Sequence, residues 1–329
     1  MERPATPIGP IGFVLPTFPQ DIPLPGAPPS GRLSADFDPL GALAAICADA
    51  VQLGAGALWA CDHLFWHGPT LDCLTTLTVA ATAAERVALG TCVLQLPLRQ
   101  ATVVAKQVAT LQTLSRGRFI LGVGVGRHAE EYEQAGVDYH TRGRQLDADI
   151  AELRRWWSAG HEPVGDGEPE RRSPYRQLPE PPAVPVWIGG SSPAARQRAA
   201  QMGDGWLPLF VEPDRYRRDL DQLGVDVAGS GRAPGSVTPA IVLFVSVDVD
   251  SATALHRGTR WMSSMYAIPP KAFERHLVSG TAQEVADRVA AYRHAGAEHV
   301  ALYVTDDRPL DQFAALVGAL SAAGVPSAV

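Results

Sequence analysis

Residues 113–126 read TLSRGRFILGVGVG, a stretch that combines an apolar run with closely spaced glycines. Its apolar run Phe119–Val123 is short and is followed by turn-forming glycines, a pattern typical of a buried strand. Seven further runs have the same character: Ile11–Leu15, Ala57–Ala60, Val87–Leu94, Val184–Ile188, Gly205–Pro208, Ala240–Val247 and His299–Val304. The sequence therefore predicts eight buried strands.

Alanine-rich amphipathic stretches lie between most of these runs and are typical of helices. The clearest are Pro39–Leu53, Gln100–Leu114, Arg144–Trp157, Ala194–Met202 and Ala282–Ala295. Alternating strands and helices favour right-handed βαβ units and a parallel sheet. Eight such units in 329 residues fit an α/β fold of the closed (β/α)8 TIM-barrel type better than an open doubly wound sheet.

Two segments interrupt this alternation and are expected to be long loops, Pro16–Pro29 and His161–Pro182. No sharp change of composition marks a boundary between domains. We therefore expect residues 1–329 to form a single barrel domain with extended βα loops.

The formal net charge of −7 is spread along the chain without an acidic or basic block. Nucleic-acid-binding proteins usually carry a basic stripe, so we expect no nucleic-acid partner. No stretch approaches the ~20 apolar residues that a membrane span needs, and the N-terminus lacks the pattern of a signal peptide. The expectation is a soluble cytoplasmic protein that acts on a small molecule.

The cysteine pattern matches no known zinc framework. The four cysteines are Cys47, Cys61, Cys73 and Cys92. A metal site built from Cys61, His63, His67 and Cys73 would have irregular spacing. We expect reduced thiols and no metal ion.

Polar residues follow the second predicted strand as Asp62-His63. The ends of barrel strands carry the active site, so these side chains are candidates for chemistry. The imidazole could hydrogen-bond a substrate oxygen or move a proton, and the carboxylate could orient it or contact a cofactor. The alternative is a structural His–Asp pair that closes the barrel rim.

The fifth predicted strand ends in Gly189-Gly190-Ser191-Ser192-Pro193. Glycines let a ligand approach the backbone, a serine can cap the following helix, and proline suits its first turn. The free N–H groups of that helix would form an anion site for a cofactor phosphate or ribityl group. The alternative is an ordinary, well-capped βα turn.

Glycines also end the fourth strand, as Gly122-Val123-Gly124-Val125-Gly126-Arg127. The dinucleotide fingerprint G-x-G-x-x-G is only weakly matched, because Arg127 stands where its last glycine belongs. We expect Gly124 and Gly126 to lie against a flat cofactor ring at the barrel mouth, the alternative being tight strand–helix packing. No nucleophile elbow, P-loop or H-E-x-x-H motif supports a hydrolase, phosphotransferase or zinc protease.

Together these segments resemble the luciferase-like monooxygenase superfamily, and within it the oxidoreductases that depend on the deazaflavin coenzyme F420. The stretch 111–157 carries most of the resemblance, with EEYEQAGVDYHTRGRQLDADIAELRRWW following the glycine-rich strand. Supporting segments are Asp62-His63, Gly90-Thr91, PVWIGGS at 185–191 and GDGWLP at 203–208. The resemblance spans residues 11–305, nearly the whole chain.

The resemblance implies roles for individual residues. It implies a non-prolyl cis peptide at Cys92–Val93, where a bulge supports the flavin or deazaflavin ring. It places Asp62 near the pyrimidine side of that ring and His63 at the hydride-transfer carbon as the acid/base. The same comparison assigns the cofactor tail to Gly189, Gly190 and Ser191, with Ser192 beside them, and a polar cofactor contact to Glu130.

The expected reaction is hydride transfer between F420 and a small organic carbonyl, enone or alcohol. The alternatives are an FMN-dependent monooxygenase and a non-catalytic ligand-binding barrel. The expected substrate lining consists of Phe18, Trp66, His67 and His128, with Phe18 on a lid formed by the Pro-rich loop. Arg127 departs from the Trp or Glu of many relatives, and family precedent suggests a homodimer.

Overall fold

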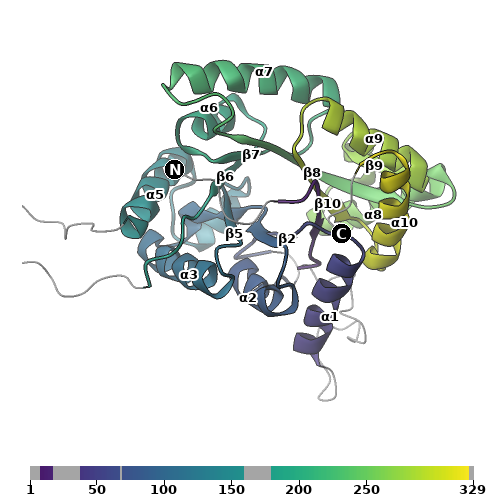
Figure 1. Cartoon of the computed structure of the whole chain (residues 1–329), viewed down its shortest axis with the longest axis horizontal. Helices are drawn as coiled ribbons and strands as arrows, with labels where there is room; N and C mark the ends of the chain where they lie inside the picture. The colour runs from purple at the N-terminus through teal and green to yellow at the C-terminus, as the bar shows by residue number, and fades with distance from the viewer. Residues whose placement is uncertain (1–7, 18–37, 67–68, 159–178, 326–329) are drawn as a thin grey trace, which may run out of the picture.

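The computed structural model describes residues 8–17, 38–66, 69–158 and 179–325, and its strands form a closed barrel (Figure 1). The strands are β1 (Ile11–Val14), β2 (Ala57–Ala60), β3 (Ala88–Thr91), β4 (Leu94–Gln95), β5 (Phe119–Gly124), β6 (Val186–Gly189), β7 (Gly205–Leu207), β8 (Thr238–Val247), β9 (Leu277–Gly280) and β10 (His299–Val304). All pairings between them are parallel. Because β10 pairs with both β1 and β8, the ring closes, which confirms the (β/α)8 barrel.

Each of the eight predicted strands is present, but two details differ from the prediction. The strand expected over Val87–Leu94 is divided into β3 and β4 by the cis peptide bond Cys92–Val93. The sequence analysis also missed β9, which pairs with Phe244–Val247 on the edge of β8 opposite β10. Its sequence, LVSG, holds only two large apolar residues, too few to register as a buried run.

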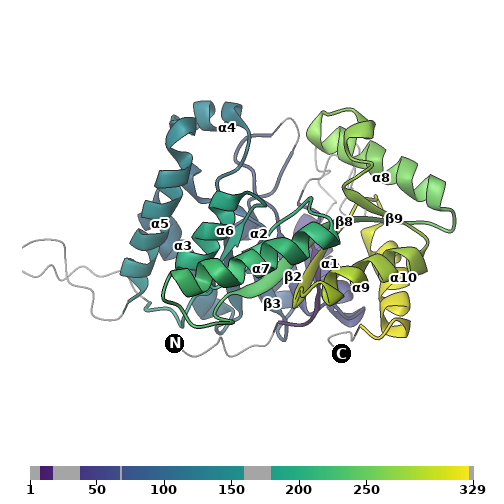
Figure 2. The ribbon, with the colours of Figure 1, turned by 90° about the horizontal axis from the view of Figure 1, so that it is seen from above.

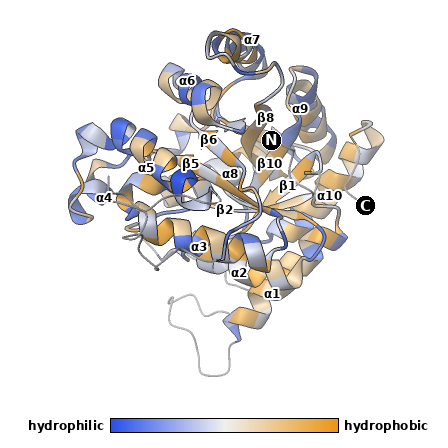
Figure 3. Ribbon diagram, turned by 60° about the vertical axis from the view of Figure 1, so that its left-hand side comes forward, coloured by the Kyte–Doolittle hydropathy of each residue, from blue (hydrophilic) through white to orange (hydrophobic). Residues whose placement is uncertain are grey.

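Helices surround the strands in Figure 1. They are α1 (Pro39–Gln52), α2 (Cys73–Ala83), α3 (Ala101–Leu114), α4 (Ala129–Gln134), α5 (Arg142–Trp157), α6 (Pro193–Met202), α7 (Pro213–Gly229), α8 (Ser251–Tyr266), α9 (Ala282–His294) and α10 (Pro309–Ala322), with short 3-10 turns at Leu96–Leu98, Tyr139–Thr141 and Pro270–Ala272. The five predicted helices are all confirmed. In Figure 3 the central strands are largely hydrophobic, while the surrounding helices mix hydrophilic and hydrophobic residues.

The TLSRGR stretch joins α3 to β5 and fastens this junction to α2. Arg116 and Gly117 adopt positive φ values of 57° and 83°, which end the helix and turn the chain. The buried Arg118 guanidinium donates hydrogen bonds to the carbonyls of Ala84 at 2.6 Å and Val87 at 2.7 Å. The side chain therefore satisfies the Ala84 carbonyl, which the end of α2 leaves unpaired, and the Val87 carbonyl directly before β3.

Two tryptophans, Trp59 and Trp187, fill the inside of the barrel, with ring centroids 5.4 Å apart. A Cβ added at Gly12 or Gly90 would overlap the indole of Trp59, and one added at Gly205 would overlap that of Trp187. Glycines in three strands thus make room for two large side chains, since protein interiors tolerate no overlap.

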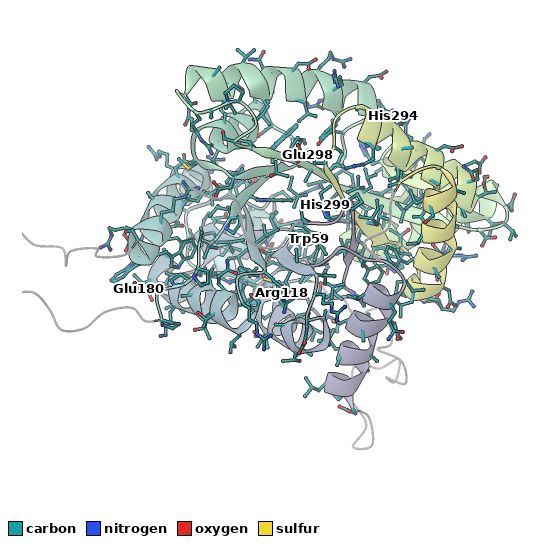
Figure 4. The ribbon with its side chains drawn as sticks, in the orientation of Figure 1. Trp59, Arg118, Glu180, His294, Glu298 and His299 are labelled. Atoms are coloured by element: carbon teal, nitrogen blue, oxygen red, sulfur yellow. The ribbon has the colours of Figure 1, made fainter. Side chains whose placement is uncertain are left out.

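His299 lies fully buried beside Trp59 at the centre of the barrel, where Figure 4 labels both residues. The indole Nε1–H donates to His299 Nε2 at 2.9 Å, so the imidazole carries its proton on Nδ1 and donates it to the Gly9 carbonyl at 2.6 Å. Burial lowers the pKa of His299 to about 4. A neutral, fully bonded imidazole therefore belongs to the architecture of the barrel.

None of the helices in the described part of the chain has the length and apolar character required to cross a membrane.

Candidate active site at the strand ends

The loops after the strands meet at one end of the barrel, and Figure 2 shows α4 and α8 at that same end. His63, three residues after β2, faces Glu131 on α4, which follows β5. The distance between His63 Nδ1 and Glu131 Oε2 is 2.8 Å. The His63 side chain is 15% exposed and the Glu131 side chain only 3%, so a buried carboxylate orients a partly accessible imidazole.

Several N–H groups hold Glu131 as an anion. Its Oε1 accepts the backbone N–H groups of Leu64 at 3.1 Å and Phe65 at 3.3 Å, and Gln95 Nε2 lies 3.1 Å from Oε2. Burial alone would raise the pKa of Glu131. The hydrogen bond and charge of His63, together with the hydrogen bonds from Gln95 and Phe65, outweigh this effect and hold the pKa below its ordinary value. The carboxylate is thus a fixed negative charge beside the imidazole.

The carboxylate that orients His63 is therefore that of Glu131. One interpretation of the sequence had given this role to Asp62. Both Asp62 carboxylate oxygens lie 2.7 Å from nitrogens of the Arg99 guanidinium, and one also accepts the backbone N–H of Gln95 at 2.9 Å. The Asp62 side chain is fully buried. It fixes the segment after β3, and its contact with a cofactor stays a prediction.

Sequence reasoning singled out Glu130 and missed Glu131. Both lie in the first turn of α4, where Glu130 is exposed and Glu131 buried. The adjacent acidic residues could have indicated that one of them faces the site. Neighbouring residues of a helix face different directions, and this six-residue helix has too few apolar positions to show which of the two faces inward. A cofactor contact by Glu130 stays a prediction.

The Cys92–Val93 peptide bond is cis, as the family resemblance implied. Val93 projects toward two neighbouring strands: a Cβ at Gly124 or Gly189 would lie 2.6 Å from its methyl groups. A Cβ at Gly126, where φ is 64°, would overlap the Gln95 side chain. These contacts within the protein explain why no Cβ fits at these three positions. Direct contact of Gly124, Gly126 or Gly189 with a cofactor ring or tail stays a prediction.

The turn after β6 has the capping geometry expected from its sequence. Gly190 adopts a φ of 112°, and the Ser192 hydroxyl accepts the backbone N–H of Ala195 at 3.2 Å, with Pro193 at the first helical position. The Arg215 guanidinium of α7, which the sequence analysis did not single out, donates to the Ser191 carbonyl at 3.1 Å. A positive charge therefore stands beside the N-terminus of α6, where anions are favoured.

Trp66 lies between two imidazoles at the same end of the barrel. Its ring centroid is 3.9 Å from that of His63 and 5.0 Å from that of His128. Burial, followed by the nearby His63 and Arg127, lowers the pKa of His128, and its Nε2 has no hydrogen-bond partner among the described residues. The rings of Trp66, His63 and His128 thus lie together, and their roles toward a substrate stay predictions. Phe18 and His67 lie outside the described residues.

Residues 11–299 match the family model of the luciferase-like monooxygenases. The chain belongs to this family. The phthiodiolone/phenolphthiodiolone dimycocerosates ketoreductase of Mycobacterium tuberculosis is 29% identical over 271 residues, which cover 66% of this chain and 70% of that protein.

Two solved structures show the same fold. An F420-dependent secondary alcohol dehydrogenase in complex with an F420-acetone adduct superposes with a TM-score of 0.75 at 18% identity, covering 95% of this chain and 99% of that one. The monooxygenase RslO1 of Streptomyces bottropensis superposes with a TM-score of 0.75 at 19% identity, covering 95% and 98%.

In this luciferase-like barrel, two buried polar groups lie among aromatic rings near the mouth. The Tyr303 hydroxyl and the Trp261 indole N–H have no hydrogen-bond partner within the described part of the chain, and their rings are 5.4 Å apart. Burial raises the pKa of Tyr303, so the hydroxyl stays protonated. Buried polar groups are normally paired, and both are therefore candidates to contact an oxygen atom of a bound molecule.

Within the described ranges, one group of side chains is compact enough to suggest a metal ligand set. Ligand atoms of Asp62, Asp72 and Cys73 lie within 4.8 Å of one another. The Arg99 guanidinium, however, is 2.7 Å from Asp62 and 3.6 Å from Asp72, where it supplies the positive charge itself. The group is an ion-pair cluster.

Proposed function

We propose that this luciferase-like protein is an oxidoreductase that transfers a hydride between coenzyme F420 and a small organic carbonyl, enone or alcohol. The observation that carries the proposal is the buried Glu131 carboxylate held 2.8 Å from His63 Nδ1 at the ends of the barrel strands. Such a pair suits proton transfer to or from an oxygen atom.

The residues at the strand ends fit a flat ring that carries an anionic tail. The capped N-terminus of α6, with Arg215 beside it, supplies the N–H groups and the charge that a phosphate-bearing tail requires. Near the mouth, His128 Nε2, Trp261 Nε1 and the Tyr303 hydroxyl have no hydrogen-bond partner within the described ranges and offer polar contacts among apolar rings. A bound deazaflavin would supply a hydride donor or acceptor, while the protein positions the reactants.

Side chains of the protein then donate or accept the proton. Because Nδ1 of His63 is engaged by Glu131, Nε2 is the nitrogen that would give a proton to a carbonyl oxygen or take one from an alcohol. The buried Glu131 carboxylate fixes the orientation of the imidazole. Trp66 packs on the ring of His63 and limits its rotation.

Two relatives support this reaction class. One curated relative is named as a ketoreductase, and a structure with the same fold is an F420-dependent alcohol dehydrogenase. The second candidate, an FMN-dependent monooxygenase, is favoured by the equal similarity to a monooxygenase of the same fold.

The test is a titration of the purified protein with F420 and FMN separately, followed by tryptophan fluorescence, because Trp66 lies at the proposed site. Micromolar binding of F420 alone, with F420 oxidised or reduced when ketones or secondary alcohols are added, is the expected result. Tighter binding of FMN with oxygen consumption would replace the proposal with the monooxygenase, and binding of neither would overturn both.

A further inference from the structure

Two thiols that the proposed reaction does not use face each other at the end of the barrel. Ala60 of β2 pairs with Thr91 of β3, and the Cys92 backbone N–H donates to the Ala60 carbonyl at 2.9 Å. Cys61 and Cys92 are therefore the next residues in register on neighbouring strands. Their Sγ atoms are 3.6 Å apart, and Cys61 Sγ also lies 3.5 Å from the Cys92 carbonyl oxygen.

The other two cysteines of the chain stand apart from this pair. Cys47 in α1 and Cys73 at the start of α2 are completely buried, whereas Cys61 and Cys92 are both partly exposed. A small oxidant in solution can therefore reach the pair more readily than either buried thiol.

We propose that Cys61 and Cys92 form a reversible dithiol–disulfide site that reacts with a peroxide. Both S–H bonds break and one S–S bond forms, so the two thiols lose two electrons and two protons. Hydrogen peroxide accepts these electrons and protons as its O–O bond breaks, and it leaves as two molecules of water. A dithiol reductant reverses the reaction by thiol–disulfide exchange.

The backbone geometry allows this bond. Cys61 and Cys92 directly follow Ala60 and Thr91, which pair across neighbouring strands. Such strands are separated by about 4.8 Å, which falls within the Cα separation of about 4.4–6.8 Å that disulfides span. The sulfur atoms must approach from 3.6 Å to about 2.05 Å, a change that rotation about the two Cα–Cβ bonds can supply.

Oxidation would alter the place where the cofactor ring is expected to lie. Cys92 forms the cis peptide bond with Val93, whose methyl groups occupy the space that a Cβ at Gly124 or Gly189 would need. A disulfide would tie the ends of β2 and β3 together directly at this bulge. This consequence rests on the proposed function: oxidation should weaken F420 binding at least tenfold, and bound F420 should slow the oxidation.

The experiment treats the reduced full-length protein with hydrogen peroxide, alkylates the remaining thiols after unfolding, and maps the peptides by mass spectrometry. The expected product is a monomeric chain lighter by two hydrogen atoms, with Cys61 linked to Cys92 and with Cys47 and Cys73 alkylated. Dithiothreitol should restore four alkylatable thiols. Oxidation to sulfinic acid without a cross-link, or a cross-link that involves Cys47 or Cys73, would overturn the proposal.

Cysteine variants provide a second test of the cross-link. Cys61→Ser and Cys92→Ser should each abolish the internal cross-link, whereas the matched control Cys47→Ala should form it as the wild type does. If the cross-link forms but F420 neither binds nor protects, the proposed cofactor fails while the dithiol site stands. If F420 binds and no cross-link forms, the dithiol site fails alone.

Discussion

Glu131 and His63 are 68 residues apart in sequence, yet their side chains meet at 2.8 Å. The carboxylate is buried and its other oxygen accepts two backbone N–H groups of the His63 loop, so the contact fixes both the imidazole and the loop that carries it. A charged hydrogen bond of this kind in a poorly solvated place is stronger than one in water. The pair is therefore held in one arrangement at the strand ends.

Replacing His63 with Ala removes the proposed acid/base. Turnover should fall by about a hundredfold or more, since general acid–base catalysis contributes at least that factor, while the dissociation constant of F420 changes little. The matched control is His294→Ala, which removes an exposed imidazole on α9. Equal turnover in the two variants would remove His63 from the mechanism.

Glu131→Gln keeps the shape of the side chain but removes its charge. His63 then loses the carboxylate that orients its imidazole, and we expect kcat to fall at least about tenfold with KM nearly constant, because only part of the general acid–base contribution is lost. Steady-state kinetics check this, and Glu130→Gln serves as the control on the exposed neighbour. A larger loss in the Glu130 variant would contradict the assignment of the orienting role to Glu131.

Gly90→Ala should test how tightly the barrel interior is filled. The added Cβ would overlap the Trp59 indole, and overpacking of this kind costs about 1–3 kcal/mol. The free energy of unfolding, from urea titration, should fall accordingly. Gly224→Ala on α7 meets no atom within 4 Å and should instead raise it by up to about 1 kcal/mol, since alanine favours helices. A neutral Gly90 variant would show that Trp59 can move aside.

The stability of the protein should depend on pH through His299. Its pKa is about 4 in the folded state against an ordinary 6.5, so below pH 6.5 the unfolded chain binds a proton that the folded chain does not. The free energy of unfolding should therefore decrease as the pH falls from 6.5 to 4, with this residue contributing up to about 1.4 kcal/mol per pH unit.

His299→Gln provides the comparison for this pH dependence. Glutamine does not titrate but can still accept a hydrogen bond from the Trp59 indole. When unfolding is measured by urea titration at several pH values, the free energy of unfolding of the variant should depend less on pH, because the contribution of His299 is absent. An unchanged slope would mean that other groups cause the acid sensitivity.

Local sequence patterns predicted the fold well because burial imposes them directly. The Phe119–Val123 run and its seven counterparts all became barrel strands, since a strand covered on both faces must be apolar throughout. The LVSG segment of β9 escaped detection because only two of its four residues are large and apolar. The cis bond at Cys92–Val93 was expected from the family resemblance and not from any property of those two residues.

The side-chain contacts of the site were only partly predictable, because they depend on tertiary packing. His63, Trp66 and His128 all follow the carboxyl ends of strands, and the structure brings their rings together, while their predicted roles at a substrate stay predictions. The choice of Glu131 over Glu130 depends on the rotation of one short helix against the barrel. The role of Gly124 depends equally on a side chain from another strand, Val93.

The sequence by itself determined the eight-stranded barrel and the strand ends that carry the polar residues, because apolar periodicity and glycine turns are local consequences of burial. The family followed from the resemblance of its motifs. The tertiary structure alone decided which side chains meet: Glu131 with His63, Arg99 with Asp62, and Cys61 with Cys92. These contacts join residues that are distant in sequence. Closing the barrel fixes the register of neighbouring strands, and that register sets which side chains stand opposite one another.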